Sequence, residues 1–131
     1  MVTGVQTCAL PISRTVWSMA APWSGGIVDR VLSQPDLRQD WMTELRHMAN
    51  RINSLRTLLA DRLTAASQRD FGWIKAQRGM FSRLPLTPEQ VVTAREALHI
   101  YMAPDGRINI AGVSPANVEH VATGLASVMR G

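Results

Sequence analysis

The sequence predicts an α+β fold in which helices, one of them long, pack on a small sheet. Two observations predict it. Large apolar residues recur at spacings of three and four between residues 37 and 63, and short runs with strand character separate the later helix signals. The chain has 131 residues, of which 46% are hydrophobic and 18% charged, so it can bury a core of single-domain size. No apolar run approaches the roughly 20 residues that a membrane-spanning helix needs.

Residues 1–13 differ from the rest of the chain, because they carry no charge and follow neither helical nor strand periodicity. They also lack the basic start of a signal peptide. The segment resembles translated sequencing-adapter read-through, so we expect 1–13 to be a non-native leader and 14–131 to be the natural domain. Cys8, the only cysteine, lies in this leader. A single cysteine excludes an internal disulfide and a multi-cysteine zinc site.

Four helices are expected. A loop over 14–26 leads into a short helix at about 25–32. Residues 33–36, Ser-Gln-Pro-Asp, form a start signal for a long helix to about residue 66. One face of this helix is predicted to face the core and carries Leu37, Trp41, Leu45, Met48, Ile52, Leu55, Leu59 and Leu63. Its charged residues, Arg56 among them, are predicted to face solvent. A capping box at 87–90 opens a helix to about 98, and Ser114-Pro115 start a last helix to about 129.

Short strands are expected between these helices. Residues 71–76 and 79–82 are predicted as two strands around Gln77-Arg78, and 100–102 as a third. Residues 103–106, Ala-Pro-Asp-Gly, predict a turn, because proline sets φ, aspartate bonds locally and glycine accepts positive φ. Residues 107–110 alternate as a strand does, which places Ile108 and Ile110 on one face and Arg107 and Asn109 on the other.

Arg107 is the most suggestive single residue for chemistry. Its guanidinium would project from a rigid strand and could grip a carboxylate or phosphate through two hydrogen bonds. The alternative, an ordinary surface arginine, stays open from spacing alone. No metal site is predicted, because His47, His99 and His120 are not at ligand spacing. Lys75, the only lysine, is read as a solvent-facing strand residue rather than a Schiff-base lysine.

Charge leaves a second class of function open. Fourteen basic and ten acidic residues give a formal net charge of +4. A small basic module that binds nucleic acid or an acidic partner is therefore the alternative hypothesis. The acids interleaved on the long helix argue against it, because pairing within the helix explains much of the charge. We expect neither a nucleic-acid nor a membrane partner.

Three blocks carry a resemblance to a known family. They are Arg14-Thr-Val-Trp-Ser18, then 69–74 (Arg-Asp-Phe-Gly-Trp-Ile) with 79–82 (Gly-Met-Phe-Ser), then 106–112 (Gly-Arg-Ile-Asn-Ile-Ala-Gly) with 114–117 (Ser-Pro-Ala-Asn). In this order they resemble the C-terminal part of the aspartate and aromatic amino acid aminotransferases, pyridoxal-phosphate enzymes of fold type I. The resemblance covers about nine-tenths of the chain and implies the family's C-terminal small domain.

The resemblance implies a role for four residues. Arg107 matches the arginine that pairs with the substrate α-carboxylate, and Arg14 the arginine that reaches a distal carboxylate across the dimer. Phe81 matches an aromatic at the substrate entrance, and Ser18 a serine near the cofactor phosphate of the neighbouring subunit. A homodimer is therefore implied, with amino acids and 2-oxo acids as substrates and pyridoxal 5'-phosphate as cofactor.

No catalytic residue is assigned in this sequence. The family's Schiff-base lysine would lie upstream of the first block, and Lys75 lies in the wrong block. The chain is therefore expected to be an aminotransferase fragment that is inactive alone. We expect a cytoplasmic location, because no export signal is recognised.

Overall fold

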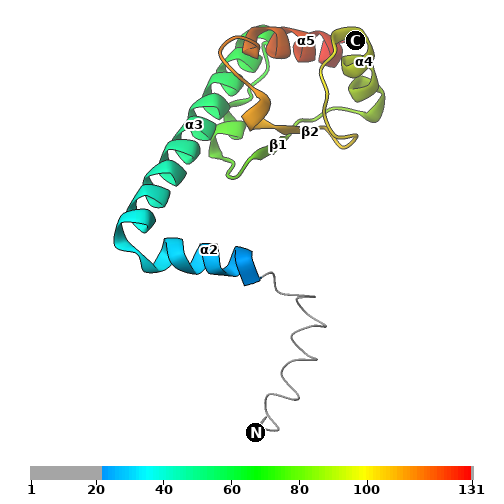
Figure 1. Ribbon diagram of the computed structural model, residues 1–131. Helices are drawn as coiled ribbons and strands as arrows, with labels where there is room; N and C mark the ends of the chain where they lie inside the picture. Colours follow the sequence, from blue (N-terminus) through cyan, green and yellow to red (C-terminus); the bar gives the residue numbers. More distant parts are fainter. Residues whose placement is uncertain (1–21, 131) are drawn as a thin grey trace, which may run out of the picture. The chain divides into compact units, whose positions relative to one another are not determined.

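A computed structural model describes residues 22–130 of the chain (Figure 1). Along the chain follow helices α2 (Pro22–Ser33) and α3 (Pro35–Ser67), the 3-10 helix η1 (Gly72–Ala76), strand β1 (Phe81–Arg83), helix α4 (Pro88–Leu98), strand β2 (Arg107–Asn109), the 3-10 helix η2 (Ile110–Gly112) and helix α5 (Val118–Arg130). This helix-rich arrangement with one small sheet confirms the predicted α+β class. None of the helices within 22–130 has the length and apolarity to span a bilayer.

The described residues form two compact units, and the boundary between them falls within α3, after Leu45. The first unit holds α2 and the beginning of α3. The second holds the rest of α3 and everything that follows.

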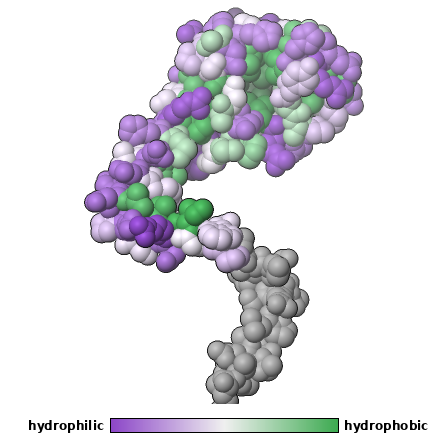
Figure 2. Space-filling view, in the orientation of Figure 1, coloured by the Kyte–Doolittle hydropathy of each residue, from purple (hydrophilic) through white to green (hydrophobic). Residues whose placement is uncertain are grey.

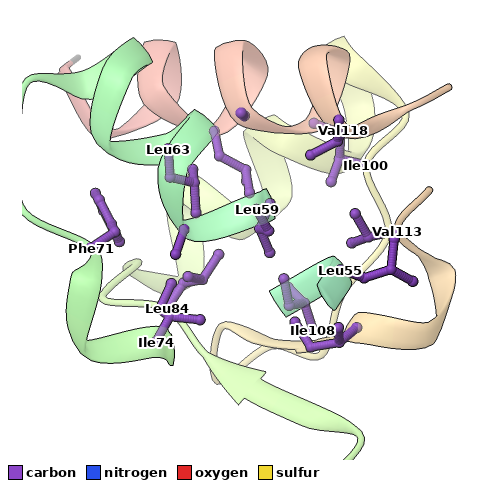
Figure 3. Packing of buried hydrophobic residues seen from close by; sticks show 14 of the residues in the cluster. Leu55, Leu59, Leu63, Phe71, Ile74, Leu84, Ile100, Ile108, Val113 and Val118 are labelled. Carbon is purple, nitrogen blue, oxygen red and sulfur yellow. The ribbon is translucent and has the colours of Figure 1, made fainter. Parts of the chain in front are cut away.

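The core of the second unit is built around the C-terminal half of α3. Leu55, Leu59 and Leu63 of this helix are at most 6% exposed. Figure 3 shows them between α5 and the segment that carries the sheet, with Val118 and Ile100 on one side and Ile74, Leu84 and Ile108 on the other. The predicted core stripe is thus confirmed for the second half of the long helix.

The first half of that stripe is not buried among the described residues. Leu37, Trp41, Leu45 and Met48 are between 39% and 55% exposed, so their predicted place in a core is wrong for this structure. Helix α2 likewise has no buried residue, and apolar side chains lie at its surface (Figure 2). Helical spacing predicts a shared face, but it does not say what covers that face.

The sheet has two antiparallel strands, and Phe81 lies opposite Asn109, Ser82 opposite Ile108 and Arg83 opposite Arg107. Two other predicted strands are wrong. Residues 72–76 form the 3-10 helix η1. Phe71, which precedes it, and Ile74 within it are three residues apart and are both buried in the core. That spacing fits three residues per turn rather than strand alternation. Residues 100–102 have no regular structure, although Ile100 is buried.

Helix α4 begins as its sequence predicts. The amide of Gln90 donates to the Thr87 hydroxyl at 3.3 Å, and the amide of Thr87 donates to the Gln90 side-chain oxygen at 3.0 Å. This reciprocal capping box, with Pro88 at the first helical position, satisfies amides that the helix itself leaves free. Gln90 also donates to the carbonyl of Val128 at 3.0 Å, which ties α4 to α5.

Candidate functional site

The candidate site is the outer face of the two-stranded sheet. Along each strand the side chains alternate between exposed and buried, so Ser82 and Ile108 face the core. The opposite face presents Phe81 and Arg83 from β1 with Arg107 and Asn109 from β2. Cross-strand partners point to the same side of a sheet. The sequence prediction that Arg107 projects away from the core is therefore confirmed.

Arg107 and Phe81, two of the predicted site residues, lie together. The guanidinium carbon of Arg107 is 5.3 Å from the centre of the Phe81 ring, within cation–π range. Both side chains remain exposed, and Phe81 keeps 48% of its surface accessible. The aromatic ring therefore limits where the guanidinium can go while its terminal nitrogens stay accessible to a ligand.

The turn before Arg107 sets its direction. Gly106 has φ of +78°, and a Cβ there would lie 2.6 Å from the carbonyl oxygen of Leu84. Only glycine accepts both conditions without strain. The amide of Gly106 donates to the carbonyl of Ala103 at 3.0 Å, and the amide of Arg107 donates to the Asp105 carboxylate at 3.2 Å. The turn predicted over 103–106, with its local aspartate bond, is thus confirmed.

Arg56 holds strand β1 from the core side. Its side chain is 1% exposed, and Nη1 donates to the Ser82 hydroxyl at 2.7 Å and to the carbonyl of Phe81 at 3.5 Å. Nη2 donates to the carbonyl of Gly79. Its Nε is buried and has no hydrogen-bond partner among residues 22–130. Burial, together with the charge of Arg78, lowers the pKa of Arg56.

The predicted solvent-facing position of Arg56 is therefore wrong. The sequence did contain a signal for it, because position 56 is four residues after Ile52 and three before Leu59. That spacing places it on the apolar face of α3. The charge of Arg56 led to the prediction that it faces solvent, but its guanidinium instead donates to the carbonyls of Gly79 and Phe81 and to the Ser82 hydroxyl.

A shallow pocket of about 370 Å³ lies at this face. Its lining is polar and cationic, with one aromatic: Gln77, Arg78, Phe81, Ser82, Arg83 and Arg107. Within residues 22–130, ion pairs shorter than 4.0 Å involve Arg62, Lys75 and Arg95 and none of the arginines in this pocket. A pocket with three guanidinium groups and no acid in its lining is suited to an anion.

Two asparagines keep the chain after β2 in place. The Asn109 side-chain oxygen accepts from the amide of Ala111 at 3.0 Å, which starts η2. The Asn117 side chain accepts from the amide of Ser114 at 2.7 Å and donates to the carbonyl of Gly112 at 3.0 Å. Asn109 and Asn117, the asparagines of the third sequence block, thus have a structural role, because their hydrogen bonds hold the backbone that follows β2.

Lys75 lies elsewhere. Its ammonium is 2.6 Å from the Asp61 carboxylate, with both side chains about half exposed, and it is not among the residues that line the arginine pocket. It lies on η1 and not on the predicted strand.

The histidines of the second unit have structural positions. The His120 ring nitrogen Nε2 is hydrogen-bonded to the carbonyl of Leu98 at 2.9 Å, and His99 ends α4 in the left-handed region at φ of 55°. Among the described residues no three metal-binding side chains cluster.

Arg14, Ser18 and Cys8 lie outside the described residues. The cross-dimer roles expected for Arg14 and Ser18 stay predictions. The same holds for the division of the chain into 1–13 and 14–131.

A sequence model of the family described as "Aminotransferase class I and II" matches residues 3–125. The chain belongs to this family. An aromatic-amino-acid aminotransferase of Paracoccus denitrificans is 41% identical over 118 residues, which cover 89% of this chain and 30% of that protein. An aspartate aminotransferase of Haemophilus influenzae is 37% identical over 119 residues, 90% of this chain and 30% of that protein.

Solved structures agree with the family assignment. An aromatic-amino-acid aminotransferase from Burkholderia pseudomallei, covalently bound to pyridoxal phosphate, matches with a TM-score of 0.85 and 42% sequence identity. The match covers 95% of this chain and 31% of the Burkholderia chain. An aromatic amino acid aminotransferase from Psychrobacter, crystallised with aspartic acid, matches with a TM-score of 0.86 and 34% sequence identity. This match covers 97% of this chain and 32% of the Psychrobacter chain. The chain therefore spans about a third of the length of the relatives it matches.

Proposed function

We propose that this chain supplies the substrate-carboxylate-binding part of an aminotransferase that exchanges an amino group between an amino acid, aspartate or aromatic, and a 2-oxo acid. The family membership favours this hypothesis over the alternative of a basic nucleic-acid-binding module. The observation that carries it is Arg107, held at the start of a strand by a glycine turn and placed over the Phe81 ring.

Arg107 would bind the α-carboxylate, the group that all amino-acid substrates share. Two parallel hydrogen bonds from one guanidinium fix both the position and the tilt of a carboxylate. Fixing this orientation before reaction lowers the entropic part of the barrier. The adjacent Phe81 ring would cover one side of the bound substrate and exclude water from the pair, which strengthens it.

Pyridoxal phosphate is the cofactor that we propose for the whole protein, where it supplies an electron sink for the substrate carbanion. The described residues do not fit a site for it. Lys75, the only lysine in the sequence, is tied to Asp61 and does not line the arginine pocket. We therefore propose that the Schiff-base lysine is supplied by polypeptide outside this sequence, and that the 131 residues alone do not transaminate.

Arg14 and Ser18 are proposed to act across a homodimer, on a distal substrate carboxylate and on the cofactor phosphate. This proposal rests on the first sequence block. The cytoplasmic location stays a prediction.

A chimera tests the proposed function. Residues 22–130 replace the matching segment of the Paracoccus aromatic-amino-acid aminotransferase, and transamination of aspartate and of phenylalanine is measured with 2-oxoglutarate as acceptor. We expect activity in the chimera and none in the 131-residue chain. Arg107→Lys should lower kcat/KM about 100-fold or more, because lysine cannot form the two-pronged bond. Arg69→Lys, an exposed position outside the pocket, serves as the matched control. Unchanged kcat/KM in folded Arg107→Lys would refute the role of Arg107.

A further inference from the structure

Strand β1 has a strand partner on one side only, because the sheet within residues 22–130 consists of two strands. The Arg56 guanidinium, from α3, supplies donors that a third strand would otherwise supply. Its Nη1 donates to the Ser82 hydroxyl at 2.7 Å and to the Phe81 carbonyl at 3.5 Å, and Nη2 donates to the Gly79 carbonyl. One side chain therefore satisfies acceptors along four consecutive residues at the start of β1.

The backbone around Phe81 is held by two different elements in turn. The carbonyl of Met80 accepts from the amide of Ile110, just after β2, at 2.8 Å. The carbonyls on either side of it, those of Gly79 and Phe81, accept from the Arg56 guanidinium. A ladder of three residue pairs is marginal on its own, so the direction of this backbone depends on Arg56 as well as on β2.

Arg56 is a costly residue for a role in packing alone. Its side chain is 1% exposed, its Nε has no hydrogen-bond partner among residues 22–130, and no ion pair there involves it. An apolar side chain of similar volume would fill the same space without the cost of desolvating a charge. An apolar side chain could not, however, orient the carbonyls on either side of the Phe81 side chain.

From these contacts we propose that Arg56 is a positioning residue of the carboxylate site and acts through Phe81 on Arg107. By fixing the backbone from which Phe81 projects, it keeps the aromatic ring at the Arg107 guanidinium, whose carbon lies 5.3 Å from the ring centre. The kinetic part of this inference rests on the proposed function of Arg107. The structural part does not.

The structural part is tested by NMR of the 131-residue chain. The ring current of Phe81 shifts the Nε–H and δ-methylene signals of Arg107, and the difference between the unaltered chain and Phe81→Leu measures this shift. We expect Arg56→Met to lose about half of the shift or more, because the marginal ladder alone then holds the ring. Arg56→Lys should keep an intermediate share, because an ammonium supplies donors without the planar fork.

Val118→Ala is the control for lost stability. It truncates a buried side chain of the same core, on α5, and leaves the contacts of β1 unchanged. It should lower the urea midpoint of unfolding and keep the whole Arg107 shift. Full retention of the shift in folded Arg56→Met, or equal losses in Arg56→Met and Val118→Ala, would overturn the proposal. If Arg56→Met does not fold, full retention in Arg56→Lys overturns it in the same way.

The kinetic part is tested in the chimera by a double-mutant cycle. Arg56→Met should lower kcat/KM for aspartate about tenfold, but by less than about twofold when Arg107→Lys is already present, because a residue that acts through Arg107 then has nothing left to position. An equal loss in both backgrounds would refute the positioning role. Unchanged kcat/KM in Arg107→Lys instead removes the proposed function of Arg107, and the NMR result then decides on Arg56.

Discussion

Replacing Arg56 by alanine should destabilise the second unit strongly, although the residue is charged and lies on a helix. The side chain is 1% exposed and donates to the Ser82 hydroxyl and to the carbonyls of Gly79 and Phe81. Its removal leaves buried acceptors without a donor, at about 1–3 kcal/mol for each group left unsatisfied. The emptied volume adds a cavity cost. A loss of about 3–5 kcal/mol in the free energy of unfolding is expected.

Arg56→Met separates the two contributions. Methionine fills most of the volume and also removes a buried charge that has no carboxylate partner among the described residues. Replacing such a charge by an apolar side chain costs less than truncating it. We therefore expect a loss of about 1–3 kcal/mol, smaller than for alanine.

The assay follows urea unfolding by circular dichroism at 222 nm, together with hydrogen exchange of the amides of residues 55–66. Hydrogen exchange is needed because the chain has two units and a single unfolding curve would mix them. Arg51→Ala is the matched control, an exposed arginine on the same helix that should change stability by less than about 0.5 kcal/mol. Equal effects of Arg51→Ala and Arg56→Ala would refute the reasoning.

Three further predictions concern backbone conformation and pH. Gly106→Ala should lower the free energy of unfolding by about 2–4 kcal/mol, measured by urea unfolding, because its Cβ would meet the Leu84 carbonyl at positive φ. His99→Gly should raise it by about 0.5–1 kcal/mol in the same assay, since His99 ends α4 at φ of 55°; a loss would contradict the strain argument. Hydrogen bonds from its own amide and from Thr87 lower the pKa of Glu89 from the ordinary value of 4.5. The stabilisation that the ionised Glu89 carboxylate contributes is therefore present above about pH 4.5 and is lost as the pH falls through the lowered pKa. In Glu89→Gln the free energy of unfolding, measured by urea unfolding, should therefore decrease less steeply as the pH is lowered below about 4.5.

What could be predicted from sequence was local. The capping box of α4 and the turn over 103–106 were predictable because the residues that form the bonds lie within four positions of each other. Strand alternation also placed Arg107 on the outer face. The run at 71–76 was misread as a strand, because a short apolar segment fits either period and the burial of Phe71 and Ile74 is decided by the helix they pack on.

The parts of the site that sequence reasoning missed depend on contacts between distant segments. Arg83 lies opposite Arg107 only because of the strand register, which joins residues 24 positions apart. Arg56 is buried because the carbonyl of Gly79, 23 positions away, accepts its hydrogen bond. A charged residue on an apolar helical face can be interpreted as a buried donor only when its acceptors are known.

Strand β1 is fixed at both ends, and this explains how so small a sheet can hold a binding residue in place. Three opposed residue pairs form a ladder that is marginal on its own. The start of β1 is tied to α3 through Arg56, and beyond its end the amide of Leu84 donates to the carbonyl of Gly106 at 2.9 Å. Phe81 and Arg107 therefore keep their relation through a helix and a turn outside the sheet. Losing Arg56 should disturb Arg107 even though the hydrogen bonds of Arg56 go to β1 and the loop before it.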